Sequence, residues 1–284
     1  MIIAINYADD NYKLQQEYNT QTAWKKGKVD CVIEYHPKDI DSAFLDKNKH
    51  IFAYKRGAGL WLWKPYIILK TLQQMNDGDY LFYCDSGAYY TKPIRKLVSV
   101  LERDGIEIMP FELPLLECQW TKRETFVEMG CDNNQTNQIL ATFLLLKKSP
   151  LAMKIVNEWL YYSQNEICIS PKLFTDIKNP NDFIAHREDQ SIFSLLCRKN
   201  GIIPYREPSQ YGDRPYIYAW TPRSGMKEYS LHYRKYPRST YPRIVVSVRK
   251  SNPKEYRWKN FIKDIFDYVG LYRLIFKYKT QAKI

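Results

Sequence analysis

An isolated carboxylate at the end of an apolar run is the first group in this chain that could do chemistry. The run YLFYC at residues 80–84 is followed by Asp85, Ser86 and Gly87. In open α/β sheets, ligands lie beyond the carboxyl ends of the strands, where a fixed carboxylate can bind a cation. Ser86 is too small to obstruct a ligand, and Gly87 frees the backbone to turn or to let one come close. An aspartate that only caps or turns the chain is the structural alternative.

The block HREDQ at residues 186–190 is the second set of chemically capable side chains. Glu188 and Asp189 directly precede apolar positions at helical spacing, and the Asn-Gly pair at 200–201 ends that predicted helix. Backbone N–H groups at a helix amino terminus favour negative charge, so ordinary capping accounts for these two acids. It does not account for the block as a whole.

His232, in the sequence YSLHYR, is the third candidate. A histidine together with carboxylates such as Asp85, Glu188 and Asp189 suits a divalent cation bound next to a diphosphate, whose oxygens supply further ligands. A surface histidine with no ligand role is the structural alternative.

The segments that would position these side chains alternate between strand-like and helix-like sequences. Strands are predicted at residues 2–7, 30–37, 80–84 and 137–150, and helices at 10–26, 63–75 and 151–162. Such alternation is typical of βαβ units and a largely parallel sheet that is buried on both faces. The predicted class is therefore α/β, with helices flanking a mostly parallel central sheet.

The composition indicates a globular protein with reduced cysteines. The chain has 284 residues, 45% of them hydrophobic, which is enough for one large domain or two small ones. Its six cysteines include no CxxC pair, so neither a zinc ribbon nor a disulfide-stapled secreted domain is expected. No apolar stretch approaches the roughly 20 residues that span a bilayer, and the first residues do not resemble a signal peptide. We expect a cytoplasmic protein.

Positive charge is concentrated late in the chain. Residues 234–284 hold 14 of the 43 lysines and arginines but only three of the 31 acidic residues. Residues 1–233 are nearly neutral. This asymmetry predicts a functional body at 1–233 and a basic docking segment at 234–284.

Residues 256–279 of the basic segment have the pattern of an amphipathic helix. The apolar positions at helical intervals are Trp258, Phe261, Ile262, Ile265, Val269, Tyr272 and Phe276, and the basic residues lie mostly off that stripe. Such a helix suits an anionic membrane surface, which would make the protein peripheral on the inner face of the cell membrane. A helix packed on the body with a solvated basic face is the alternative, and Gly270 interrupts the pattern.

Three blocks in this order resemble one family. They are RGAGLWLWKPYIILKTL at 56–72, DGDYLFYCDSGAYY at 77–90 and HREDQSIFSLL at 186–196. Together they resemble the GT-A glycosyltransferases that build bacterial capsule and lipopolysaccharide chains, over about residues 2–232. The resemblance implies a nucleotide-sugar-binding catalytic domain at 1–233 that uses Mn²⁺ or Mg²⁺ with a DxD motif.

The resemblance also implies a metal site, with one departure. Asp85 stands at the first aspartate of the DxD motif, but Gly87 replaces the second, so the motif offers one carboxylate. His232 resembles the late histidine ligand of glycogenin-type transferases and would join Asp85 as a metal ligand. Arg56 and Lys64 are the cations that could compensate for the missing carboxylate.

Further site residues follow from the same resemblance. Donor binding is expected of Tyr7, Ala8 and Asp9 at the end of the first strand, of Arg56, Trp63 and Lys64 before and at the start of the 63–75 helix, and of Asp85, Ser86 and Gly87. An acidic surface loop and core packing of tryptophans are the alternatives for the first two groups. Asp189 is the first candidate for a catalytic base that deprotonates the acceptor hydroxyl, and Glu188 is the second. The Asp-Gln pair also resembles that of retaining glycogenin-like enzymes, where it positions the donor.

The implied function is transfer of a sugar, as in a hexosyltransferase, from a nucleotide sugar, with UDP expected, to a saccharide or lipid-linked oligosaccharide. A nucleic-acid-binding protein that acts through its basic aromatic tail is a competing interpretation. A catalytically degenerate GT-A binding module is another. The neutral α/β body with its acidic clusters favours the transferase, so nucleic acid is not an expected partner.

Overall fold

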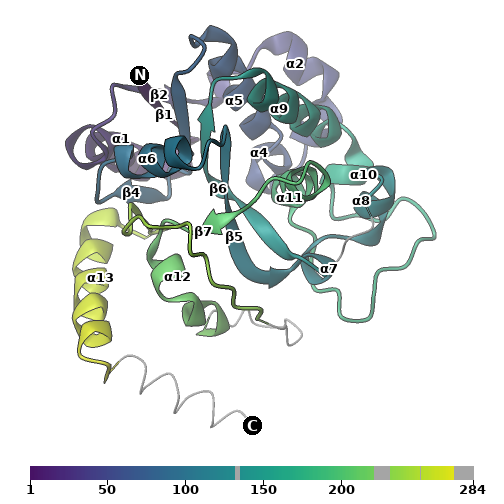
Figure 1. Ribbon diagram of the computed structural model, residues 1–284. Coiled ribbons are helices and arrows are strands. Elements are labelled where there is room, and N and C mark those ends of the chain that lie inside the picture. Colours follow the sequence, from purple (N-terminus) through teal and green to yellow (C-terminus); the bar gives the residue numbers. More distant parts are fainter. Residues whose placement is uncertain (132–134, 221–230, 250, 272–284) are drawn as a thin grey trace.

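A six-stranded sheet forms the centre of the computed structural model, which describes residues 1–131, 135–220, 231–249 and 251–271 (Figure 1). In spatial order the strands are β2 (Cys31–Tyr35), β1 (Ile2–Tyr7), β3 (Tyr80–Cys84), β6 (Asn137–Lys147), β5 (Ile108–Leu116) and β7 (Tyr205–Arg206). Strand β6 is antiparallel to both β3 and β5, and the other pairs are parallel. Five strands therefore run one way and β6 runs the other. The predicted α/β class, with a mostly parallel sheet flanked by helices, is confirmed.

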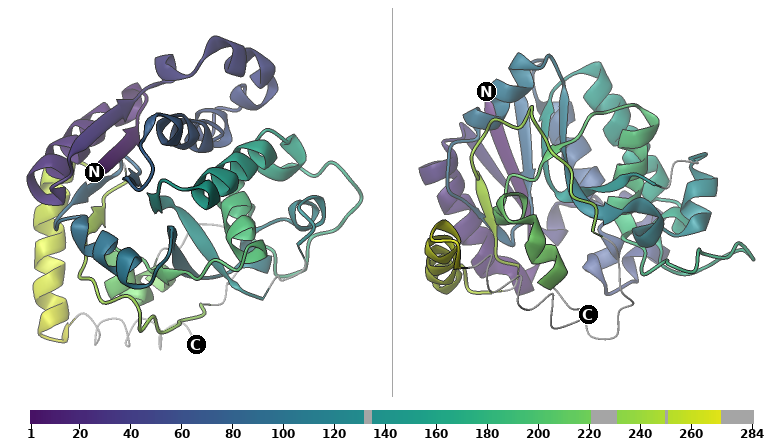
Figure 2. Two further views of the ribbon diagram at one scale, coloured as in Figure 1. Left: turned by 45° about the horizontal axis from the view of Figure 1, so that its top comes forward. Right: turned by 60° about the horizontal axis from the view of Figure 1, so that its bottom comes forward.

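Helices cover both faces of this sheet. The α-helices are α1 (Lys13–Thr22), α2 (Ser42–Lys47), α3 (Lys49–Phe52), α4 (Gly57–Leu60), α5 (Trp63–Gln74), α6 (Arg95–Arg103), α7 (Glu117–Trp120), α8 (Arg123–Glu128), α9 (Pro150–Ser163), α10 (Glu166–Ile169), α11 (Glu188–Lys199), α12 (Gln210–Asp213) and α13 (Pro253–Tyr268). Shorter helical turns are Asp10–Tyr12, Ala23–Gly27, Pro37–Asp39 and Pro215–Trp220. Figure 2 shows α9 and α11 on one side of the sheet and α6 on the other.

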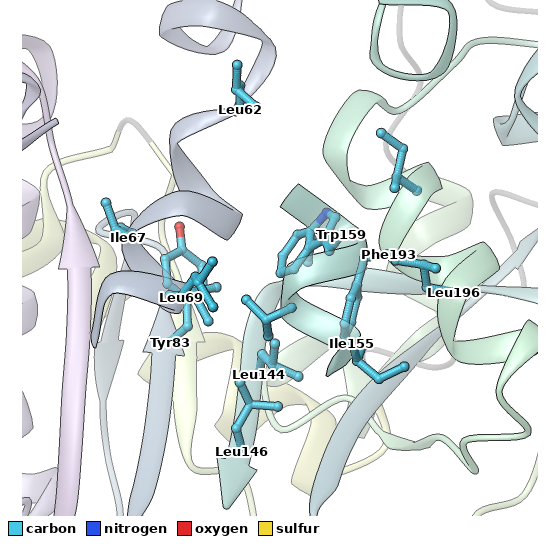
Figure 3. Packing of buried hydrophobic residues seen from close by; sticks show 14 of the residues in the cluster. Leu62, Ile67, Leu69, Tyr83, Leu144, Leu146, Ile155, Trp159, Phe193 and Leu196 are labelled. Atoms are coloured by element: carbon cyan, nitrogen blue, oxygen red, sulfur yellow. The ribbon is translucent and has the colours of Figure 1, made fainter. Parts of the chain in front are cut away.

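Alternation along each strand divides the core into two layers. On β3, Leu81 and Tyr83 point to the layer of α5, α9 and α11, whereas Phe82 points to the layer of α6. Figure 3 shows the first layer, where Leu144 of β6 lies near Trp159 of α9. Burial on both faces explains why these strands are apolar throughout.

The sequence-based elements agree with this fold where the structure describes them. The predicted strands correspond to β1, β2, β3 and β6, and the predicted helices correspond to α1, α5 and α9. The helix predicted after Asp189 is α11, which begins at Glu188. The tail helix predicted at 256–279 is seen as α13 up to Tyr268, and residues 272–279 lie outside the described part.

The boundary expected at 233/234 does not coincide with the edge of the core. Strand β8 (Val245–Ser247) pairs with β4 (Ala88–Tyr90) as a small second sheet, and Tyr241 and Ile244 are buried with the α6 layer. Residues 241–248 therefore pack as part of the body. Among the described residues, no helix has both the length and the apolar character to cross a bilayer.

Candidate active site

A cavity of about 720 Å³ opens at the carboxyl ends of β1 and β3. Eight of the predicted site residues line it, namely Tyr7, Ala8, Asp9, Arg56, Trp63, Asp85, Ser86 and Gly87. Other segments contribute Lys55, Trp61, Tyr83, Trp120, Thr142, Arg187, Gln190, Glu207, Tyr211, Tyr218, Ser247 and Arg249. Lys64, Glu188, Asp189 and His232 are not among the lining residues. The cavity thus lies where ligands bind in open α/β sheets.

Asp85 projects into this cavity from the end of β3. Its backbone N–H donates to the carbonyl of Thr142 on β6 at 3.0 Å, which fixes where the strand ends. Its Oδ1 accepts the hydroxyl of Tyr83 at 2.5 Å and lies 3.5 Å from Nζ of Lys64. The side chain is still 34% exposed. Asp85 is therefore a fixed carboxylate with a face toward the cavity.

Ser86 and Gly87 have structural tasks that the sequence did not predict. The Ser86 hydroxyl donates to the carbonyl of Tyr7 at 2.5 Å and so ties the ends of β1 and β3 together. A Cβ on Gly87 would lie 3.0 Å from Cα and 3.1 Å from O of Arg249. The carbonyl of Gly87 accepts the N–H groups of Val248 and Arg249. The space where a Cβ of Gly87 would lie is thus filled by the backbone after β8, while Gly87 still lines the cavity, and its part in donor binding stays a prediction.

Tyr7 and Trp63 form one aromatic wall. Their rings stack with centroids 3.8 Å apart and planes 16° apart, and the indole N–H donates to the carbonyl of Gly57 at 2.9 Å. Burial raises the pKa of Tyr7, with the nearby Asp9 as a further cause. Asp9 itself caps the turn that follows β1 through the N–H of Asn11. These residues combine core packing with a surface toward the cavity.

A left-handed turn of five residues borders the cavity before α5. Gly57, Ala58, Gly59, Leu60 and Trp61 all have positive φ, between 49° and 93°. Left-handed backbone costs roughly 1–2 kcal/mol for each residue other than glycine, so such a run persists only where its surroundings impose it. Ala58 and Trp61 line the cavity. Strain of this kind is enriched at functional sites.

Lys64 and Asp189 form a buried ion pair beneath the cavity. Lys64 Nζ lies 2.9 Å from Asp189 Oδ2, and it also donates to the carbonyl of Ala141 at 3.2 Å. Burial raises the pKa of Asp189 to about 7, against the opposing effect of Lys64. Burial alone would lower the pKa of Lys64, but the carboxylates of Asp189 and Asp85 outweigh it and raise that pKa. The lysine therefore links the predicted base to the strand-end carboxylate.

Glu188 is paired in a similar way with Arg56. Arg56 Nε lies 2.6 Å from Oε1 of Glu188 and Nη2 lies 3.3 Å from Oε2, a two-bond contact. Glu188 has φ of 42°, which a side chain adopts only under constraint. Its carboxylate is 4% exposed, whereas the Arg56 side chain is 59% exposed. Glu188 thus holds a cavity-lining cation in place.

Two residues of the HREDQ block line the cavity, namely Arg187 and Gln190. Arg187 lies over the ring of Trp120 at 4.1 Å. Gln190 donates to Oε1 of Gln138 at 2.7 Å and accepts the N–H of Ala141 at 3.4 Å, so its amide is fixed at both ends. His186, in contrast, is buried, and burial lowers its pKa to about 3.

Glu207 joins this cavity to a second one of about 530 Å³. Glu207, Tyr211 and Tyr218 line both. The Glu207 carboxylate accepts the hydroxyls of Ser209 at 2.5 Å and Tyr218 at 2.7 Å, and burial raises its pKa. It is the carboxylate shared by the two spaces among the described lining residues.

The described residues do not fit the expected Mn²⁺ or Mg²⁺ site. In the part of the chain that the structure describes, no three His, Cys, Asp or Glu side chains lie close enough together to hold a metal. His232 is exposed, and its backbone is bonded to Pro114 and Asn137. Asp85 alone offers too few of the six or more oxygen ligands that such ions take. Metal ligation by Asp85 and His232 stays a prediction, and no step below uses a metal.

Several lining residues escaped the sequence analysis. Glu207 and Arg249 follow very short strands, β7 and β8, that give no periodic signal. Arg249 was also counted with the basic tail. Gln190 adjoins Asp189, and its place in the same block was the available signal.

Comparisons with known proteins give distant likenesses of fold. No protein-family model matches this chain. No curated protein sequence matches it either. Among solved structures, mouse xyloside xylosyltransferase 1 is 10% identical over 89% of this chain and 97% of its own, with a TM-score of 0.47.

Two further structures are similar at the same level. The galactosyltransferase LgtC, in complex with donor and acceptor sugar analogues, is 14% identical over 87% of this chain and 86% of its own, with a TM-score of 0.45. The glycosyltransferase GlyE of Streptococcus pneumoniae is 13% identical over 95% of this chain and 64% of its own, with a TM-score of 0.38. At such identities and TM-scores, these likenesses assign no role to any residue of this chain.

Proposed function

We propose that this chain is a glycosyltransferase of the GT-A type, which moves a sugar from a nucleotide-sugar donor to a saccharide acceptor. One observation carries the proposal. The cavity at the ends of β1 and β3 combines a fixed carboxylate, Asp85, with aromatic walls and four cationic side chains. A nucleoside diphosphate sugar needs this combination, because it has an aromatic base, two negative phosphates and a polar sugar.

The cations are suited to the diphosphate of the donor. Lys55, Arg56, Arg187 and Arg249 line the cavity, against three lining acids. Guanidinium groups match phosphate oxygens in geometry and stay charged at every physiological pH. When the bond to the sugar breaks, negative charge grows on the leaving diphosphate, and these side chains would stabilise it.

In the transfer step, an acceptor hydroxyl oxygen forms a bond to the anomeric carbon while the bond from that carbon to the diphosphate oxygen breaks. The hydroxyl proton must pass to a base. We propose Glu207 for the acceptor side, since it lies where the two cavities meet and its raised pKa favours proton uptake. The second cavity, with Tyr233 and Tyr236 in its wall, is then the place for the acceptor saccharide.

Asp189 and Glu188 take positioning roles in this proposal. Their carboxylates face Lys64 and Arg56, and neither lines the cavity. They fix the cations near Asp85 and the donor, in place of the catalytic-base role predicted for them.

Finer features of the proposal rest on the sequence blocks that resemble capsule and lipopolysaccharide enzymes. They are UDP as the nucleotide, a hexose as the sugar, and a saccharide or lipid-linked oligosaccharide as the acceptor. A location on the cytoplasmic side of the cell membrane would give access to lipid-linked acceptors.

The test is calorimetry with UDP, GDP, CMP and dTDP, each with and without Mn²⁺, followed by release of the nucleotide from the matching nucleotide sugars. We expect one nucleotide to bind selectively. Asp85→Asn should weaken that binding at least about tenfold, because it removes a charged acceptor for hydrogen bonds from the ribose hydroxyls of the ligand. Glu207→Gln should keep the binding and lower turnover by about 100-fold or more, as for loss of a proton acceptor.

Asp41→Asn is the matched control, because Asp41 is exposed and lies outside the cavity. It should change neither binding nor turnover. If folded protein binds none of the nucleotides, the proposal is wrong. If one nucleotide binds but no nucleotide sugar turns over with mono- and oligosaccharide acceptors, the chain is a binding module.

A further inference from the structure

Helix α13 packs on the body through its polar face. Asn260 is 4% exposed, and Asp264 and Asp267 are half-buried against the body. Helices of globular proteins usually turn their apolar stripe inward. Figure 1 shows α13 at the edge of the molecule, beside β4 and α12, and Figure 2 agrees. Pro253 and Tyr256 make apolar contacts at the start of the helix, but the rest of the contact side is polar, the reverse of the usual pattern.

Charged groups hold the helix in this orientation. Arg243 lies 2.8 Å from Asp264, and the buried Arg214 lies 3.1 Å from the same carboxylate. Arg214 also donates to Asn260 at 3.1 Å, and Tyr216 donates to Asp267 at 2.7 Å. Hydrogen bonds between charged groups are the stronger kind, so this network fixes which face of α13 points outward.

The outward face is apolar. Trp258 is 70% exposed, Phe261 54%, Ile262 49%, Ile265 46% and Phe266 42%. These positions lie within one broad arc of the helix. A continuous apolar surface of this kind, held outward by a polar contact, marks an interaction site.

The charge around this face is positive. Asp264 and Asp267 are two of the three acids after residue 233, and both point to the body. Lys254, Arg257 and Lys259 are exposed, with Glu255 as the remaining acid of the segment. An apolar stripe bordered by cations is complementary to anionic lipid headgroups above an apolar interior.

We propose that α13 is a docking helix for an anionic lipid bilayer surface, which the Arg214–Arg243–Asp264 network holds with its apolar face outward. The helix would lie in the plane of the interface, because its 16 residues are too few to span a bilayer. A second copy of the chain fits less well, since it would bring the same cations together. The inference does not depend on the proposed enzymatic activity, because lipid binding is measured without any sugar.

The experiment is flotation of the full-length protein with vesicles of phosphatidylglycerol and phosphatidylcholine (1:1), and with vesicles of phosphatidylcholine alone. We expect binding to the anionic vesicles only, weakened when salt rises from 0.1 to 0.5 M. The double change Ile262→Ser and Ile265→Ser should lower the partition coefficient at least about tenfold, since two apolar side chains no longer enter the bilayer. Lys254→Glu with Lys259→Glu should also lower it, and high salt should reduce that difference.

Matched controls come from other exposed surfaces. Leu151→Ser with Tyr161→Ser removes exposed apolar side chains from α9, and Lys47→Glu with Lys49→Glu reverses exposed charges near α2 and α3. Neither pair should change vesicle binding. Trp258→Phe should retain binding but lose the fluorescence quenching that brominated lipid chains cause.

Three results would overturn the proposal. Wild type could fail to float with anionic vesicles, or the double variant Ile262→Ser with Ile265→Ser could bind them as well as wild type. The wild type could also be a dimer by light scattering that this double variant converts to a monomer, without any vesicle binding, which would assign the face to self-association.

Discussion

Lys64 shows how one residue can join separate parts of a site. It is 3% exposed, and its ammonium group lies near Asp189 of α11 and near Asp85, directly after β3. A buried charge is tolerated only when partners compensate for the lost hydration, and removal of one partner typically costs about 3–5 kcal/mol. The lysine was predicted to bind the donor, and the structure places it beneath the cavity, where it joins these two carboxylates.

Asp189 should give stability a particular pH dependence. Its pKa is raised from 3.8 to about 7 in the folded state, chiefly by burial. The folded state therefore holds this proton more tightly, and the free energy of unfolding should fall as pH rises from about 4 to about 7. Relative to Asp189→Asn, we expect wild type to lose on the order of 1 kcal/mol or more across this range, measured by urea unfolding.

Asp41→Asn serves as the control for this pH experiment. The hydrogen bond from Tyr66 and the neighbouring Lys70 lower the pKa of Asp41, so any slope it contributes has the opposite sign. If the difference in free energy of unfolding between wild type and Asp189→Asn stays constant from pH 4 to pH 7, the raised pKa of Asp189 is contradicted.

At the scale of elements, the left-handed turn before α5 positions Trp61 in the wall of the cavity. Gly57 has φ of 62°, and a Cβ there would lie 2.4 Å from the ring of Trp61. Trp61 in turn lies 5.3 Å from the Arg56 guanidinium, ring centroid to Cζ. Because Gly57 has no Cβ, the ring of Trp61 can pack against the backbone at Gly57, next to the guanidinium of Arg56.

Gly57→Ala and Gly105→Ala form a matched pair that separates strain from crowding. Gly105 has nearly the same φ, 63°, but a Cβ there would meet no atom within 4 Å. We expect Gly105→Ala to destabilise the protein by about 1 kcal/mol from the backbone conformation alone. Gly57→Ala should cost at least about 1 kcal/mol more, because the ring of Trp61 must move. Urea unfolding measures both changes.

The same pair reports on the cavity. Gly57→Ala should weaken nucleotide binding, whereas Gly105→Ala, which lies after α6, should leave it unchanged. Equal destabilisation by the two substitutions would show that Trp61 does not constrain the turn.

Strand β5 shows why sequence predicts only part of this fold. Strands β1 and β3 are uninterrupted apolar runs and were predicted, but β5 (IMPFELPLL) contains two prolines and a glutamate. Prolines are tolerated at irregular positions, and the pairing of β5 with β6 shifts register twice along this strand. Glu112 is buried because Arg198 and Arg234 neutralise it from far away in the chain. Such compensation is invisible to local patterns.

The candidate site was predictable to a similar extent. Asp85 was predicted because residues 80–84 form an uninterrupted apolar run and because ligands bind at the carboxyl ends of strands in open α/β sheets. Glu207 and Arg249 were not found, because tertiary contacts bring them to the cavity from segments with no periodic pattern. The pairing of Glu188 with Arg56 and of Asp189 with Lys64 was also out of reach of the sequence, since burial decides it.

At the scale of the whole molecule, ion pairs and hydrogen bonds attach helix α13 to the body. Asp264→Ala should loosen that attachment, since Arg243 and the buried Arg214 lose a carboxylate. We expect faster cleavage of α13 in limited proteolysis, by about five- to tenfold, for a loss of about 1–1.5 kcal/mol in attachment. The melting temperature of the body should change less, because α13 lies at the edge of the molecule, beside β4 and α12, and contributes no residue to the two main core layers.

Glu255→Ala is the control on the same helix. It removes the same charge and similar bulk, but from an exposed position in the first turn of α13. Cleavage of α13 that rises equally in both variants would show that the network with Asp264 does not hold the helix.

The place of β6 in the sheet has a consequence for how the chain is made. This strand joins β3 to β5, yet it follows both in sequence and ends only at Lys147. A ribosome-bound chain that stops short of β6 carries β3 with one open hydrogen-bonding edge and β5 with both edges open, because β7 also follows β6 in sequence. Such a state is prone to mispairing between neighbouring chains. The interval in which residues 117–147 emerge is therefore when a nascent chain most needs protection by a chaperone.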